Sequence, residues 1–128
     1  MDNYVSVEDY ETMVSEAAIY KDAVKEFVSS GNTEAIAKLF NVFYATTGLA
    51  GEAGEVANKV KKILRDNKGF IDADVRKKVL GELGGVAWYL AAVSAEFDLS
   101  LNDVMAYNFD QITDRQKRNV LQGDGDDR

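Results

Sequence analysis

The segment at residues 75–97, VRKKVLGELGGVAWYLAAVSAEF, decides the fold class because its apolar residues recur at steps of four and three. That spacing places them along one face of an α-helix. They are Val75, Val79, Leu83, Val86, Leu90, Val93 and Phe97. No part of the chain shows the apolar and polar alternation of a β-strand, so the sequence predicts an all-α protein.

Further helices are expected on both sides of this segment, because the chain contains no proline to break them. Ser6, three residues before Asp9, suits the start of a first helix, and Ser100 forms a capping-box pattern with Asp103 at the start of a last one. The other helices are expected at residues 6–31, at residues 32–69 and from residue 100 onward.

The length of 128 residues suits one domain with a single hydrophobic core. We therefore expect an all-α bundle of four to five helices that spans residues 1–128. The composition of residues 118–128 predicts a flexible polar tail.

The chain contains no histidine and no cysteine. This excludes disulfides, thiol nucleophiles, zinc sites of the cysteine and histidine type, and catalytic triads that depend on histidine. A di-iron site of the bundle type is also disfavoured, because it uses histidine ligands. Any metal would be bound through oxygen atoms, which favours Mg²⁺ or Mn²⁺.

The formal net charge of −7 argues against binding to a nucleic-acid polymer, which requires a basic surface. No apolar run approaches the length of about 18 residues that a membrane helix needs, and the first residues lack an apolar signal segment. We therefore expect no membrane association and a location in the cytoplasm.

Two acids in the segment GLAGEAGEVANK at residues 48–59 have a spacing of chemical interest. Glu52 and Glu55 lie three residues apart, so they project from nearly the same face of a helix and repel each other unless a cation lies between them. If the helix at residues 75–97 packs closely against this one, Glu82 can meet both acids. The alternative is a solvated helix face on which Lys59 balances the acids.

Glycines surround these acids, and each glycine inside a helix costs about 1 kcal/mol relative to alanine. One explanation is close packing of two helices. The alternative is that Gly48 and Gly51 break the helix at residues 32–69 into two shorter ones.

The residues GLAGEAGEV at 48–56, GELGGVAWYLA at 81–91 and LSLNDV at 99–104, together with Asn108, resemble the MazG-like all-α nucleoside triphosphate pyrophosphohydrolases. The resemblance is to their small phage and bacterial members and covers about residues 40–128. It implies a metal-dependent hydrolase that cleaves between the α and β phosphates. The products are a nucleoside monophosphate and inorganic diphosphate. The resemblance to phage relatives suggests a purine deoxynucleotide such as dGTP, and phage-encoded members act in the host cytoplasm.

The resemblance also implies roles for individual residues. Glu52, Glu55 and Glu82 would bind the metal, and Glu55 would orient or deprotonate the attacking water. The phosphates would be faced by Lys59, Tyr89 and Asn108. A basic stretch would contribute from the same or a neighbouring subunit, formed by Arg115, Lys117 and Arg118.

One position departs from the family pattern, which places an aspartate three residues after the acid of the later helix. Gly85 occupies that position here. The alternative function is therefore a catalytically weakened nucleotide-binding or regulatory protein of the same fold, and a third possibility is a purely structural helical oligomer.

Two further expectations concern the apolar surface. The glycine and alanine stripe around Trp88 exceeds what one small bundle can cover, which predicts a homodimer or homotetramer. Four aromatic residues are candidates for a nucleobase pocket, although core packing is favoured for each: Tyr4, Tyr10, Tyr20 and Phe40.

Overall fold

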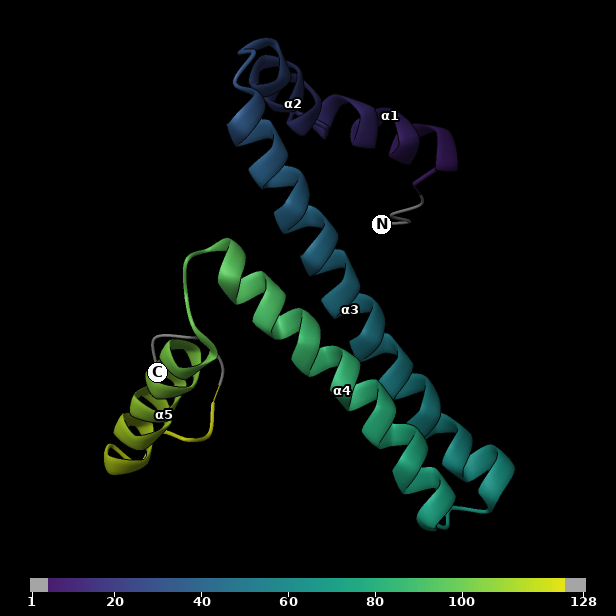
Figure 1. Cartoon of the computed structure of the whole chain (residues 1–128). Helices are drawn as coiled ribbons and strands as arrows, with labels where there is room; N and C mark the ends of the chain where they lie inside the picture. The colour runs from purple at the N-terminus through teal and green to yellow at the C-terminus, as the bar shows by residue number, and fades with distance from the viewer. Residues whose placement is uncertain (1–4, 124–128) are drawn as a thin grey trace. The chain divides into compact units, whose positions relative to one another are not determined.

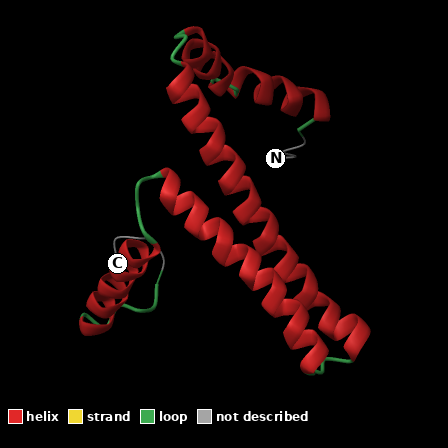
Figure 2. Ribbon diagram, in the orientation of Figure 1, coloured by secondary structure: helices red, strands yellow, loops and turns green. Residues whose placement is uncertain are grey.

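The computed structural model describes residues 5–123, and within this range every regular element is an α-helix. The all-α prediction is therefore confirmed for the described part of the chain (Figure 2). The helices are α1 (Val7–Ala17), α2 (Tyr20–Ser29), α3 (Thr33–Asn67), α4 (Ala73–Glu96) and α5 (Leu101–Lys117). None of them is long and apolar enough to cross a membrane.

The chain divides into two compact units, residues 1–39 and residues 40–128. The first unit holds α1, α2 and the beginning of α3. The second holds most of α3 together with α4 and α5, and it contains the predicted site residues.

The first unit differs from its prediction, because the helix expected at residues 6–31 is divided. Ala18 leaves helical geometry with φ −78° and ψ 51°, and the amide of Ile19 donates to the carbonyl of Ala17 at 2.8 Å in place of an α-helical bond. This short turn separates α1 from α2. The predicted cap is confirmed, because the Ser6 hydroxyl accepts from the amide of Asp9 at 3.0 Å.

In the second unit α3 and α4 lie side by side and run in opposite directions (Figure 1). The short link between them begins where Lys68 and Gly69 take positive φ angles of 52° and 83°. Asp72 then caps α4 by accepting from the amide of Val75 at 2.9 Å. The boundary predicted at residues 66–69 is confirmed. The proposed break at Gly48 and Gly51 is wrong, because α3 is continuous.

The less exposed residues of this hairpin recur at steps of three and four on both helices, the spacing of a two-helix seam. We call these residues the seam. On α3 they are Val42, Ala45, Leu49, Glu52, Val56, Lys59 and Ile63, and on α4 they are Val75, Val79, Glu82, Val86, Tyr89, Val93 and Glu96. The seam is therefore apolar near the link and partly polar in its middle.

The seam corrects part of the predicted apolar stripe on α4. Leu83 is 49% exposed and Phe97 is 57% exposed. On α3, Val60 and Leu64 are also exposed. Two packed helices bury only a narrow strip, whereas the predicted stripe is as wide as the face of a helix in a larger core. The residues outside the strip form an apolar groove lined partly by Val60, Leu80 and Leu83.

The last helix, α5, begins with the predicted capping box, in which the side chains of Ser100 and Asp103 each accept from the other's backbone amide. Ser94, near the end of α4, is buried, and its carbonyl accepts from the amide of Leu99 at 2.9 Å. The expected tail at residues 118–128 begins where α5 ends, and residues 124–128 lie outside the described range.

Candidate functional site on the α3–α4 hairpin

Glu52 lies in the seam of α3 and faces Gly85 of α4. A β-carbon built on Gly85 would lie 2.5 Å from Oε2 of Glu52 and 2.6 Å from its carboxyl carbon. The absence of a side chain at Gly85 therefore makes room for the Glu52 carboxylate. Position 85, where the MazG-like pattern has an aspartate, faces Glu52, one of the predicted metal ligands.

Glu82 and Lys59 form an ion pair across the two helices. The Lys59 Nζ lies 3.0 Å from Oε1 of Glu82, and the two side chains are only 29% and 23% exposed. Lys59 thus supplies a positive charge beside one of the predicted metal ligands. The expected meeting of Glu82 with Glu52 and Glu55 stays a prediction, and the contact that the structure shows between Glu82 and α3 is the ion pair with Lys59.

Glu55 lies on the exposed side of α3, where its Oε2 accepts from Nδ2 of Asn58 at 3.5 Å. Within residues 5–123 no group of three carboxylates is arranged to hold a metal ion. Glu52 and Glu82 are both in the seam, whereas Glu55 lies at its edge. The predicted three-carboxylate site is therefore not assembled in this arrangement of side chains.

Tyr89 of α4 lies against α3 at Gly48. A β-carbon at Gly48 would overlap the Tyr89 ring, so this glycine permits the close approach. The pKa of the Tyr89 phenol is raised, first by the neighbouring Tyr44 phenol and then by desolvation, a hydrogen bond to Tyr44 and the charge of Glu52. The Tyr89 phenol carries an O–H group that can donate a hydrogen bond.

An aromatic hollow of about 650 Å³ opens beside Tyr89. We use this name for the space lined by Phe40, Asn41, Phe43, Tyr44, Thr47, Gly48 and Tyr89. Among the aromatic candidates for a nucleobase pocket, Phe40 lines this hollow. Tyr10 and Tyr20 are exposed in the first unit, and Tyr4 lies outside the described residues.

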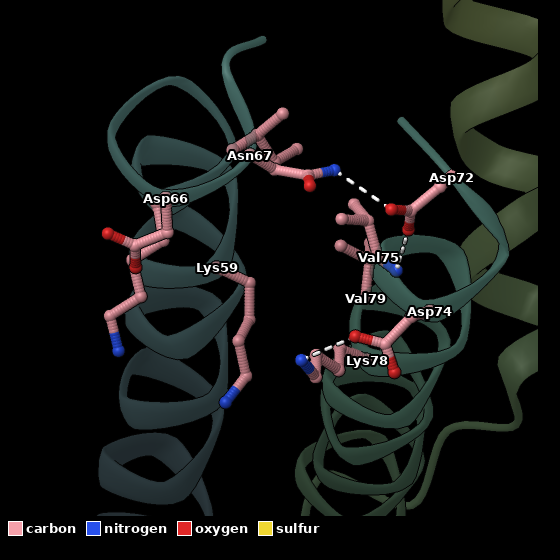
Figure 3. A pocket seen from close by; sticks show the side chains of 10 residues that line it. Lys59, Asp66, Asn67, Asp72, Asp74, Val75, Lys78 and Val79 are labelled. Atoms are coloured by element: carbon pink, nitrogen blue, oxygen red, sulfur yellow. Dashed lines mark hydrogen bonds and ion pairs between the residues drawn. The ribbon is translucent and has the colours of Figure 1, made fainter. Parts of the chain in front are cut away.

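A second pocket of about 320 Å³ extends from Lys59 toward the link between α3 and α4 (Figure 3). Its charges are largely paired. Lys78 bonds Asp74 at 2.6 Å, and Asp72 accepts from Nδ2 of Asn67 at 3.0 Å. These pairings lower the pKa of Asp72, through the amide of Val75 first and then through Asn67. The bond from Asn67 to Asp72 therefore connects the two helices near the link, and few charges of this pocket are left to bind a ligand.

The remaining predicted residues lie on α5 or directly after its end. Asn108 is exposed, Arg115 is half-buried, and Arg118 forms an ion pair with Asp114 at 2.8 Å. The predicted role of these residues and of Lys117 at the phosphates stays a prediction.

The sequence-based reasoning missed Phe43, Tyr44, Asn41 and Thr47. Their signal is present in the sequence, because Phe40, Tyr44 and Gly48 follow one another at steps of four and so share one face of α3.

These features define a helical protein whose central antiparallel hairpin carries acids and a lysine within its packing seam. Over 122 residues the chain is 42% identical to the Gene 37 protein of Mycobacterium phage L5, an alignment that covers 95% of this chain and 98% of the phage protein. The chain belongs to the family of that phage protein. No protein-family model and no solved structure matches the chain.

Proposed function

We propose that this protein is a nucleoside triphosphate pyrophosphohydrolase that uses Mg²⁺ or Mn²⁺ and converts a (d)NTP and water into a (d)NMP and diphosphate. The observation that carries the proposal is the placement of Glu52, Glu82 and Lys59 in the hairpin seam, where charged groups destabilise packing and are expected only for a reason. The MazG-like resemblance of these segments supports the same function.

The carboxylates provide the oxygen ligands that Mg²⁺ and Mn²⁺ prefer. The space at Gly85 supports this fit, because it holds the carboxylate of Glu52 where the family pattern has its own acid. Glu52, Glu82 and Glu55 would hold the metal. When bound, the metal would neutralise phosphate charge and polarise the phosphorus that water attacks.

The residues of the chain would divide the remaining work. Glu55, which accepts a long hydrogen bond from Asn58, takes a proton from the attacking water. The water oxygen bonds to the α-phosphorus while the bond to the bridging oxygen breaks, and that oxygen leaves with diphosphate. Lys59 shifts from Glu82 to the phosphates, and Tyr89 donates a hydrogen bond to them.

A second function is favoured by one observation. The three acids do not form a metal-binding group within residues 5–123, and Lys59 already neutralises Glu82. A nucleotide-binding or regulatory protein that has lost catalysis would retain this arrangement.

We also propose a homodimer or homotetramer in the host cytoplasm. The exposed apolar groove along Val60, Leu80 and Leu83 supports association, because a contiguous apolar surface favours burial against another surface.

The test is a panel of ribo- and deoxynucleoside triphosphates incubated with the protein and Mg²⁺ or Mn²⁺, with monophosphate and diphosphate measured as products. Glu82→Gln should abolish release. Glu34→Gln, an exposed acid in the first turn of α3, should leave it unchanged. Thermal stabilisation by nucleotide without product release would favour the second function. If nucleotide neither stabilises the protein nor is hydrolysed, both functions are excluded.

A further inference from the structure

The aromatic hollow presents several large rings to solvent. Phe40 is 66% exposed, Phe43 is 60% exposed and Tyr44 is 73% exposed, and Tyr89 borders the same space from α4. Single exposed aromatic residues are common, but adjacent exposed rings around one hollow indicate a surface that binds something.

The hollow also contains polar groups that have no partner within residues 5–123. Among the described residues, the side chains of Asn41 and Thr47 make no hydrogen bond, whereas the hydroxyl of the neighbouring Thr46 donates to the carbonyl of Val42 at 2.7 Å. An amide can both donate and accept, and a hydroxyl can do the same. Aromatic faces together with such groups match what a nucleobase offers, which is a flat π surface with polar edges.

The hollow is continuous with the acidic part of the seam. Tyr89 lies over Gly48 at the wall of the hollow, and its phenol is close enough to Glu52 for the carboxylate charge to help raise the phenol's pKa. Glu52 follows Gly48 by one helical turn. A base in the hollow would therefore place its attached phosphates near Glu52 and Glu82. The volume of about 650 Å³ lies within the range of roughly 300–1,000 Å³ for small-ligand sites.

We propose that the aromatic hollow is the nucleobase subsite of the substrate, in which the base stacks on Phe43 and Tyr44 and its edge bonds to Asn41 and Thr47. This inference rests on the proposed function and specifies its substrate. A purine presents a larger stacking surface than a pyrimidine, so purine nucleotides bind more tightly.

The experiment measures binding of monophosphates, which separates recognition from hydrolysis. Isothermal titration calorimetry with the full chain and Mg²⁺ should show that dGMP and dAMP bind more tightly than dCMP, and that ribose 5-phosphate, which has no base, binds at least about tenfold more weakly than dGMP.

Variants then assign the contact to the hollow. Tyr44→Ala and Phe43→Ala should each weaken dGMP binding about tenfold and leave ribose 5-phosphate binding unchanged. The matched control is Phe70→Ala, which removes an equally exposed ring outside the hollow and should change neither affinity. Asn41→Ala, a surface change that leaves the rings in place, should reduce the difference in binding affinity between dGMP and dCMP. Circular dichroism verifies that each variant retains its helices.

Equal binding of dGMP and ribose 5-phosphate, or unaltered dGMP affinity in both ring variants, would overturn the base subsite. A ring variant that changes the mass measured by light scattering while retaining its nucleotide affinity would also overturn it, since the hollow would then be a contact between protein chains. Base-dependent binding without diphosphate release would support the subsite and remove only the hydrolase function. Diphosphate release with an unaltered KM in the ring variants would support the hydrolase function and remove the base subsite.

Discussion

The two parts of the α3–α4 seam are built from different chemistry. Near the link, Ile63 of α3 lies close to Val75 and Val79 of α4, as expected of two packed helices. In the middle, Lys59 pairs with Glu82, and Glu52 fills the space at Gly85. Apolar packing stabilises the part near the link. The middle part is stable only where its charged groups are paired or hydrated.

We propose that this difference separates residues that are needed for folding from residues that are retained for function. A charged pair within a packing interface loses hydration, and its attraction often does no more than offset that loss. On this proposal the apolar part of the seam accounts for the stability of the hairpin, and the polar part serves to bind a ligand. The predictions below challenge this division, beginning with the largest effect.

Glu55→Gln should reduce turnover by at least about 100-fold, because it removes the carboxylate assigned to the attacking water. Helix content should not change, since Glu55 is exposed at the edge of the seam. Product release measured at saturating metal gives the effect, with Glu34→Gln as the control. Unchanged turnover, or full activity in excess chelator, would remove the proposed catalytic role.

Gly48→Val should lower the free energy of unfolding by about 1–3 kcal/mol, because its side chain would overlap the ring of Tyr89. The control is Gly51→Ala in the same helix, where a β-carbon meets no atom within 4 Å. That change should raise stability by up to about 1 kcal/mol through helix propensity. Urea denaturation measures both, and equal effects at the two glycines would contradict the packing described for Tyr89.

Gly85→Asp should lower the melting temperature in chelator, because it brings a second carboxylate against Glu52. Added Mg²⁺ or Mn²⁺ should recover the loss and bind more tightly than to the unmodified chain. Gly85→Ala is the control for bulk alone, since the Glu52 side chain is flexible and can yield to a methyl group. An aspartate variant with unaltered metal affinity would separate position 85 from the metal site.

Asp72→Asn should reduce the sensitivity of the hairpin to acid, the smallest expected effect. Hydrogen bonds from Val75 and Asn67 lower the pKa of Asp72 below its unfolded value. Its contribution is therefore present above the unfolded pKa of about 3.9 and is lost as the pH falls through the lower folded pKa. Melting temperatures of both proteins between pH 2 and 7 measure the change, and identical acid profiles would show that this cap does not contribute.

Local signals in the sequence predicted much of the fold. The caps at Ser6 and Ser100 and the helix end near Gly69 depend on neighbouring residues, so they could be found without the structure. The turn at Ala18 and Ile19 could not, because neither glycine nor proline marks it.

Contacts between helices were harder to predict. The sequence identified Glu52, Glu82 and Lys59 as chemically notable, but their ion pair and the space at Gly85 depend on the register of α3 against α4. Apolar periodicity placed Leu83 inside, whereas Leu83 is 49% exposed and Glu82 lies in the seam. The α3 side of the hollow could have been found from the spacing of Phe40, Tyr44 and Gly48, whereas the contribution of Tyr89 depends on how α4 packs against α3.

The central claim is that the polar part of the seam serves function and is not needed for folding. Its most direct test is the double variant Lys59→Met and Glu82→Leu, which gives the middle of the seam the apolar chemistry of its end. We predict that the free energy of unfolding is unchanged or rises by up to about 4 kcal/mol, while diphosphate release from the best substrate falls at least about 100-fold. A double variant that unfolds more easily, or that retains full turnover, would contradict the account.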